Sequence, residues 1–280
     1  MIAEAVALAK KSDIAILYIG GNREYESEGR DRKDLSLPFG EQVLVEAVTA
    51  VNQKTIVVVV GGAPYDIGAI KKQNNTIVWS WYNGSENGNA LADVFIGIVN
   101  PSGKLPFTFP ASIDQSPAHA MKAYPGENLS VTYKEGILVG YRWFDTKKIE
   151  PLYCFGYGLS YTDFSYSRLQ TSKTNYKSGE TITVTLTITN SGKYDGKETV
   201  QLYINKSGSA VERADKELKA FKKIMVNKGA AVEVKLKIPV ADLAYYDTSK
   251  SKWIIEPGKY TLLAGTSSGI IKLNTTITIE

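Results

Sequence analysis

The sequence predicts two folds in succession: an α/β layered sandwich, represented in part, followed by an all-β sandwich of the immunoglobulin or fibronectin type III-like kind. Short apolar runs alternate with helical periodicity over residues 1–112. Period-two strand patterns with regular turn signals fill residues 166–280. Residues 113–165 follow neither pattern and are rich in Pro, Gly, Tyr and Phe, so we expect an irregular connecting segment between the two domains.

The first segment has the pattern of repeated βα units. Residues 1–11 have the spacing of an amphipathic helix, and residues 13–20 form a short apolar run typical of a buried strand. The β-branched run at 55–61 is typical of a strand buried on both faces of a parallel sheet. Helices are also expected at 41–51, 65–72 and 86–97, and a strand at 76–82. Such alternation predicts a parallel sheet covered by helices.

The last segment has the pattern of a β-sandwich. Residues 181–189 alternate Thr with Ile, Val or Leu, as in a strand with one buried face. Further strand runs at 199–205, 231–239, 253–255, 259–264 and 270–279 are separated by turn signals. The G-x-S-x-G pattern at 265–269 joins two of these runs, so it predicts a hairpin turn and not a nucleophile elbow.

Composition excludes several classes of site. Cys154 and His119 are the only residues of their types, so no intrachain disulfide and no cysteine-based metal site can form, and we expect no metal and no cofactor. No apolar run approaches the ~18 residues of a membrane span, and the N-terminus lacks the pattern of a signal peptide. The excess positive charge of residues 166–280 lies on alternating strands, which favours a solvated sheet face over nucleic-acid binding.

An acidic cluster follows the first predicted strand. Glu24, Glu26 and Glu28 lie at positions i, i+2 and i+4, beyond the carboxyl end of a strand, where open α/β sheets place ligands. In an extended segment the three side chains would share one face, and their repulsion would raise at least one pKa, as a general acid requires. The alternative is a solvated loop in which these carboxylates pair with nearby arginines, and the residues alone leave both interpretations open.

Aromatic residues offer a second candidate feature. Trp143, in the irregular segment, is a candidate substrate-binding residue on which a sugar could stack, whereas Trp79 is better explained as core. Core or interdomain packing is the alternative for Trp143 as well.

Several motifs occur together in a fixed order. They are E-G-R-D-R at 28–32, N-P-S-G-K-L-P-F-T-F-P at 100–110, G-Y-R-W-F at 140–144, F-G-Y-G-L-S-Y-T at 155–162 and K-E-L-K-A-F at 216–221. Together they resemble glycoside hydrolase family three, the β-glucosidase and β-xylosidase family, over essentially the whole chain.

The resemblance implies a role for the acidic cluster. Members of the family have a (β/α)₈-type barrel that carries a nucleophilic aspartate, then an α/β sandwich that carries the general acid/base glutamate, and often a fibronectin-like domain. By motif position the acid/base is Glu28, with Glu26 and Glu24 as fallbacks. No part of residues 1–280 resembles the barrel. The chain is therefore expected to be the C-terminal portion of a retaining β-glycosidase, most simply a β-glucosidase.

The expected partners are a β-linked oligosaccharide or glycoside and the N-terminal barrel, without which the chain is expected to be inactive. The competing hypothesis is a non-catalytic carbohydrate-binding or scaffolding protein built from the same domains. A nucleotide-binding protein is disfavoured because no phosphate-binding loop is present.

Overall fold

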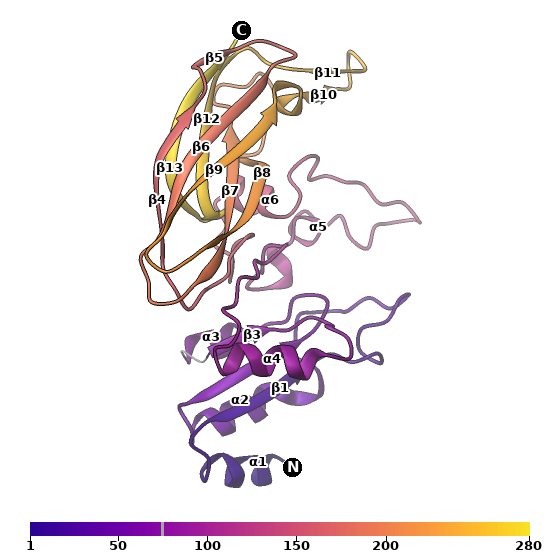
Figure 1. Cartoon of the computed structure of the whole chain (residues 1–280). Coiled ribbons are helices and arrows are strands. Elements are labelled where there is room, and N and C mark those ends of the chain that lie inside the picture. Colours follow the sequence, from indigo (N-terminus) through magenta and orange to yellow (C-terminus); the bar gives the residue numbers. More distant parts are fainter. Residues whose placement is uncertain (74–75) are drawn as a thin grey trace. The chain divides into compact units, whose positions relative to one another are not determined.

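The computed structural model describes residues 1–73 and 76–280. These residues form two compact units, Met1–Ala92 with Phe109–Ser116 and Asp93–Thr108 with Pro117–Glu280. Each unit has its own sheets (Figure 1). The connecting segment predicted at 113–165 is divided between them, and most of it belongs to the second unit.

A parallel sheet organises the first unit. Its strands, in spatial order, are β1 (Ala15–Gly20), β2 (Thr55–Val60) and β3 (Thr76–Trp79). Gly20 pairs with Val60, and Val59 pairs with Trp79, so the carboxyl ends of the three strands align. The central strand buries residues 57–59 completely, as its β-branched sequence predicts. Loops that follow these strands therefore meet at one edge of the sheet.

Helices follow the strands as predicted. They are α1 (Ile2–Ala9), the 3₁₀ turn η1 (Pro38–Gly40), α2 (Glu41–Thr49), α3 (Gly68–Lys72) and α4 (Asn87–Phe95). Helix α2 packs against β1, β2 and α1. Strand β1 differs from its prediction, because Ile16 and Tyr18 are 45% and 54% exposed. These two side chains lie on the same face of the strand, and among the described residues this face lacks the cover that the prediction of a buried strand assumed.

The second unit is a two-sheet sandwich (Figure 1). One sheet has the order β5-β13-β12-β7-β8, a second has the order β4-β6-β9, and β10 and β11 form a separate hairpin. The bounds are β4 (Phe164–Thr171), β5 (Asn175–Tyr176), β6 (Thr181–Asn190), β7 (Gly196–Asn205), β8 (Glu217–Val226), β9 (Ala231–Pro239), β10 (Tyr245–Asp247), β11 (Lys252–Ile254), β12 (Gly258–Ser267) and β13 (Ile270–Ile279). A 3₁₀ turn, η3 (Val240–Leu243), follows β9.

The sandwich core follows from the alternation of its strands. On β6, the apolar residues Ile182, Val184, Leu186 and Ile188 are buried, and they belong to one core cluster with apolar side chains of β7, β9, β12 and β13. The predicted strand at 231–239 coincides with β9. The turn predicted at 265–269 connects β12 to β13, which confirms a hairpin connection. Strand β8 was not predicted, because its lysines interrupt the alternation of apolar and polar residues.

Short helices occur within residues 113–165. They are η2 (Ile113–Gln115), α5 (Pro117–Ala120) and α6 (Tyr141–Lys147). Helix α6 is bound to the sandwich: the Leu218 N–H donates to the Tyr141 hydroxyl at 2.7 Å, and the Asp215 N–H donates to the Thr146 hydroxyl at 2.8 Å. Lys216 forms an ion pair with Asp145 at 3.2 Å. The helix is therefore an integral part of the second unit.

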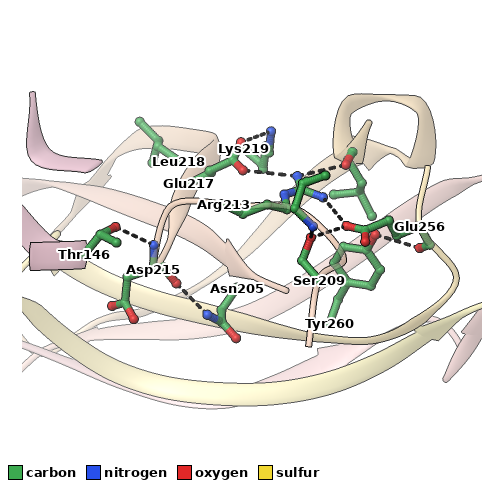
Figure 2. A network of polar contacts seen from close by, with 12 residues as sticks. Thr146, Asn205, Ser209, Arg213, Asp215, Glu217, Leu218, Lys219, Glu256 and Tyr260 are labelled. Carbon is green, nitrogen blue, oxygen red and sulfur yellow. Dashed lines mark hydrogen bonds and ion pairs between the residues drawn. The ribbon is translucent and has the colours of Figure 1, made fainter. Parts of the chain in front are cut away.

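A network of buried charges holds the segment between β7 and β8 (Figure 2). Arg213 contacts Glu217 at 3.1 Å and Glu256 at 3.5 Å. Glu256 also accepts hydrogen bonds from the Ser209 hydroxyl and the Ala210 N–H, at 2.6 and 2.8 Å. Burial alone would raise the pKa of Glu256, but these hydrogen bonds and the charge of Arg213 lower it. These contacts all lie within the second unit, and we assign the network to the packing of the sandwich.

Candidate active site

The loop that carries the acidic cluster begins at the carboxyl end of β1. Gly20 has a φ of +128°, and a Cβ there would lie 1.8 Å from the Val60 carbonyl oxygen, so this position requires glycine. The Gly20 N–H donates to the Glu41 carboxylate at 2.7 Å, and the Gly21 N–H donates to the Val60 carbonyl at 3.0 Å. The start of the loop is thereby joined to α2 and β2.

A hydrogen-bonded turn centred on Asn22 follows. The Asn22 side-chain oxygen accepts from the N–H groups of Glu24 and Tyr25 at 2.9 and 3.2 Å. Its backbone carbonyl accepts from the Glu26 N–H at 2.8 Å. The segment is a turn and not an extended strand, so the condition under which all three glutamates would share one face is not met.

Glu26 is directed to the ends of the neighbouring strands. Its carboxylate accepts hydrogen bonds from the hydroxyls of Tyr65 and Tyr82, and from the Gly62 N–H at 3.0 Å. Arg32 completes the set with an ion pair of 3.3 Å. We call these five residues the Glu26 cluster. Tyr65, Tyr82 and Gly62 were not predicted as site residues, although each follows β2 or β3 at the sheet edge where ligands were expected.

Arg32 is itself fixed by neighbours. Its guanidinium donates to the Pro64 carbonyl and lies 4.5 Å from the centroid of the Tyr65 ring. A guanidinium over an aromatic face is favourable, and it combines here with the ion pair to Glu26. The prediction of a carboxylate paired with a nearby arginine is confirmed for this pair.

The cluster determines the ionisation of its members. Burial would raise the pKa of Glu26, but the hydrogen bonds from Tyr65, Tyr82 and Gly62 and the charge of Arg32 together lower it. Burial and the neighbouring Glu26 carboxylate raise the pKa of Tyr82 to about 12, and the same causes raise the pKa of Tyr65 further. Glu26 is therefore an anion bound by neutral and cationic donors, and its pKa is lowered instead of raised as a general acid requires.

Glu24 and Glu28 have different surroundings. Both are exposed and line a cavity of about 630 Å³ together with Asn22, Arg23, Ser27 and Arg30. Within residues 1–73 and 76–280, neither carboxylate takes part in a side-chain hydrogen bond or an ion pair. The structure thus brings Glu24 and Glu28 to one cavity and directs Glu26 elsewhere.

Trp143 lies in α6 of the second unit. It is 8% exposed and packs in a buried cluster with Leu138, Phe144 and Ala214. The Lys147 ammonium lies 5.6 Å from its ring centroid. Little of the ring remains open to a sugar, so its surroundings favour the packing interpretation. Trp79 packs edge-to-face on Phe109 at 5.0 Å, as expected of a core residue.

The described part of the chain contains no group of three or more His, Cys, Asp or Glu residues that could hold a metal ion. Among the same residues, no helix has both the length and the apolar composition to cross a bilayer.

Two family models match successive parts of the chain. Residues 1–161 match the glycosyl hydrolase family 3 C-terminal domain, and residues 198–268 match the fibronectin type III-like domain. The chain is 41% identical over 280 residues to thermostable beta-glucosidase B of Acetivibrio thermocellus, covering 100% of this chain and 37% of that protein.

Solved structures give the same result. The crystal structure of a family 3 beta-glucosidase from Bifidobacterium adolescentis matches with a TM-score of 0.93 and 38% identity, over 99% of this chain and 40% of that one. The beta-glucosidase of Kluyveromyces marxianus in complex with glucose matches with a TM-score of 0.94 and 36% identity, over 100% of this chain and 33% of that one. The chain thus spans 33% to 40% of the length of these relatives. It belongs to glycosyl hydrolase family 3 and corresponds to that family's C-terminal and fibronectin type III-like domains.

Proposed function

We propose that this chain supplies the general acid/base of a retaining β-glucosidase whose nucleophile lies in a barrel domain of a longer polypeptide. The observation that carries the proposal is the pair of exposed carboxylates, Glu24 and Glu28, on an ordered loop at the carboxyl edge of the sheet. The names of the relatives as beta-glucosidases support the choice of reaction and of a β-linked glucoside as substrate.

Glu26 is unsuited to the acid role. A general acid must hold a proton before the bond to the leaving group breaks, whereas the surroundings of Glu26 lower its pKa. Its carboxylate is also occupied by four donors. The fallback to Glu26 is therefore not proposed further.

The remaining candidates differ in how firmly the backbone holds them. Glu24 lies inside the hydrogen-bonded turn formed by Asn22, between two anchored positions. Glu28 carries the family motif, but it precedes Gly29, whose φ is +77°. Because an acid/base must be held close to its reactive position, we place Glu24 first and Glu28 second.

The chemistry requires two carboxyl groups about 5–5.5 Å apart across the sugar. In the first step the nucleophile of the barrel would attack the anomeric carbon while the loop glutamate protonates the departing oxygen. In the second step the same glutamate would remove a proton from water, which then hydrolyses the covalent intermediate. A loop at the edge of this sheet can present such a group to a neighbouring domain.

A second surface is consistent with a missing partner domain. Large apolar side chains are about half or fully exposed along the segment that precedes α6: Leu129, Val131, Tyr133, Ile137 and Val139. Contiguous exposed apolar residues mark surfaces that contact another protein or domain. We assign this segment to the contact with the barrel.

The test compares the 280-residue chain with a longer polypeptide in which it follows a family 3 barrel. The chain alone should not hydrolyse aryl β-glucosides, and the longer polypeptide should. Turnover by the chain alone would contradict the proposal. Binding of β-glucans without hydrolysis by the longer polypeptide would instead favour the carbohydrate-binding alternative.

A further inference from the structure

We propose that Glu26 is a positioning residue, whose carboxylate joins the loops after β1, β2 and β3 and thereby holds Glu24 and Glu28 at the cavity. The contacts rest on the structure alone, whereas the catalytic consequence rests on the proposed function above. Glu26 lies on the loop after β1, Gly62 and Tyr65 follow β2, and Tyr82 follows β3. One carboxylate therefore connects all three strand ends of the described sheet.

The hydrogen-bonding pattern around Glu26 requires a carboxylate ion. Two hydroxyls, one backbone N–H and one guanidinium all act as donors toward its two oxygens. An ionised carboxylate accepts at both oxygens, whereas a glutamine presents one acceptor and an NH₂ group that would face donors. Glutamine, although nearly identical in shape, should therefore fail at this position.

Three glycines leave the space that Glu26 occupies. A Cβ on Gly21 would lie 2.1 Å from the Tyr65 hydroxyl, and a Cβ on Gly61 would lie 2.5 Å from the Tyr65 ring. A Cβ on Gly62 would meet the Tyr82 ring at 3.2 Å and the Glu26 carboxylate at 3.4 Å. The backbone around the Glu26 cluster thus lacks side chains at the positions where a side chain would displace its members.

Arg32 extends the effect to the second half of the loop. It binds both Glu26 and the Pro64 carbonyl, so residues 27–31 lie between two fixed points, Glu26 and Arg32. Glu28 lies in this interval, while Glu24 lies in the interval between Gly21 and Glu26. The Glu26 cluster therefore positions both candidate acid/base residues, whichever of them reacts.

The lowered pKa of Glu26 supports this role. A catalytic acid/base gains and loses a proton in each cycle, and its supporting contacts must survive that change. Because Glu26 stays ionised at pH values where an ordinary carboxyl group takes up a proton, its contacts should persist while the acid/base changes its protonation state.

The first test uses the 280-residue chain and hydrogen–deuterium exchange. In Glu26→Gln, the amides of Tyr25, Glu26 and Gly62 should exchange at least about tenfold faster, because local opening becomes easier. Tyr82→Phe removes one donor and should give a smaller increase in the same amides. Glu46→Gln, an exposed change on α2, is the matched control, and amides of β6 report whether each variant remains folded. Unchanged exchange of the three loop amides in folded Glu26→Gln would overturn the proposal.

The second test uses the longer polypeptide with its barrel. Glu26→Gln should lower kcat by about 10- to 100-fold for glucosides with poor leaving groups, with a smaller effect on KM. Glu26→Asp, which keeps the charge, should recover part of the loss. If the loop amides of Glu26→Gln exchange faster while its kcat on poor leaving groups equals that of the wild type, the positioning role is refuted. Faster exchange of the loop amides in Glu26→Gln, together with full activity of both Glu24→Ala and Glu28→Ala, would refute the proposed function. The structural role of Glu26 would then remain intact.

Discussion

Glu24 and Glu26 lie two residues apart on the loop after β1, and the Asn22 turn directs their carboxylates to different surroundings. Glu26 accepts hydrogen bonds from the ends of β2 and β3, whereas Glu24 lines the cavity of about 630 Å³. Two residues of the same type thereby have different surroundings, to which we assign a structural role for Glu26 and a proposed chemical role for Glu24. The division depends on the turn, because in an extended strand both would point to the same face.

The ionisation of Glu26 predicts a pH dependence of stability. Its folded-state pKa is lowered, so its contribution to stability is present above its ordinary pKa of 4.5 and is lost as pH falls through the folded value. The difference in unfolding free energy between the natural chain and Glu26→Gln should therefore be largest above pH 4.5 and shrink below it. Chemical denaturation at a series of pH values above and below 4.5 measures this difference. A difference that grows toward acid pH would be inconsistent with the lowered pKa.

Replacing Asn190 should strongly reduce the stability of the second unit. It is 0% exposed, and its side-chain oxygen accepts from the Thr162 hydroxyl at 2.6 Å while its NH₂ group donates to the carbonyls of Tyr194 and Val226. Asn190→Ala should destabilise the sandwich by about 2–4 kcal/mol, because buried groups left unpaired cost about 1–3 kcal/mol each. Asn274→Ala, at an exposed position of β13, is the control and should change stability by less than about 0.5 kcal/mol. Equal effects of the two variants in thermal unfolding would contradict the assignment.

The second unit should need residues before 166 for full stability. Tyr141 and Phe144 are buried in α6, and Tyr141 stacks on Phe155 at 4.7 Å. Residues 166–280 should fold as a β-sandwich, but a fragment of residues 117–280 should melt at a temperature higher by at least about 5 °C, since each kcal/mol shifts the midpoint by several degrees. Circular dichroism of the two fragments provides the comparison. Identical melting temperatures would show that α6 contributes nothing to the sandwich.

The periodicity of apolar residues was sufficient to predict the helices and strands but not to predict the contacts of the candidate site. Strands such as β2 and β9 follow from patterns that depend on burial alone, which the sequence displays directly. The Glu26 cluster could not be predicted, because Tyr65 and Tyr82 come from different loops and meet Glu26 through the alignment of strand ends. The burial of Trp143 could not be predicted either, because an aromatic residue in a segment without periodicity has the same sequence pattern whether it is buried or exposed.

We propose that a loop glutamate of this chain is the acid/base of a β-glucosidase. The most direct measurement is azide rescue in the longer polypeptide with its barrel, on an aryl β-glucoside with a good leaving group. Glu24→Ala should slow turnover by about 10²- to 10⁴-fold, and azide should restore much of it, because the small anion needs no general base to attack the intermediate. The product should then be β-glucosyl azide. Wild-type turnover in both Glu24→Ala and Glu28→Ala, with no azide adduct from either, would contradict the claim.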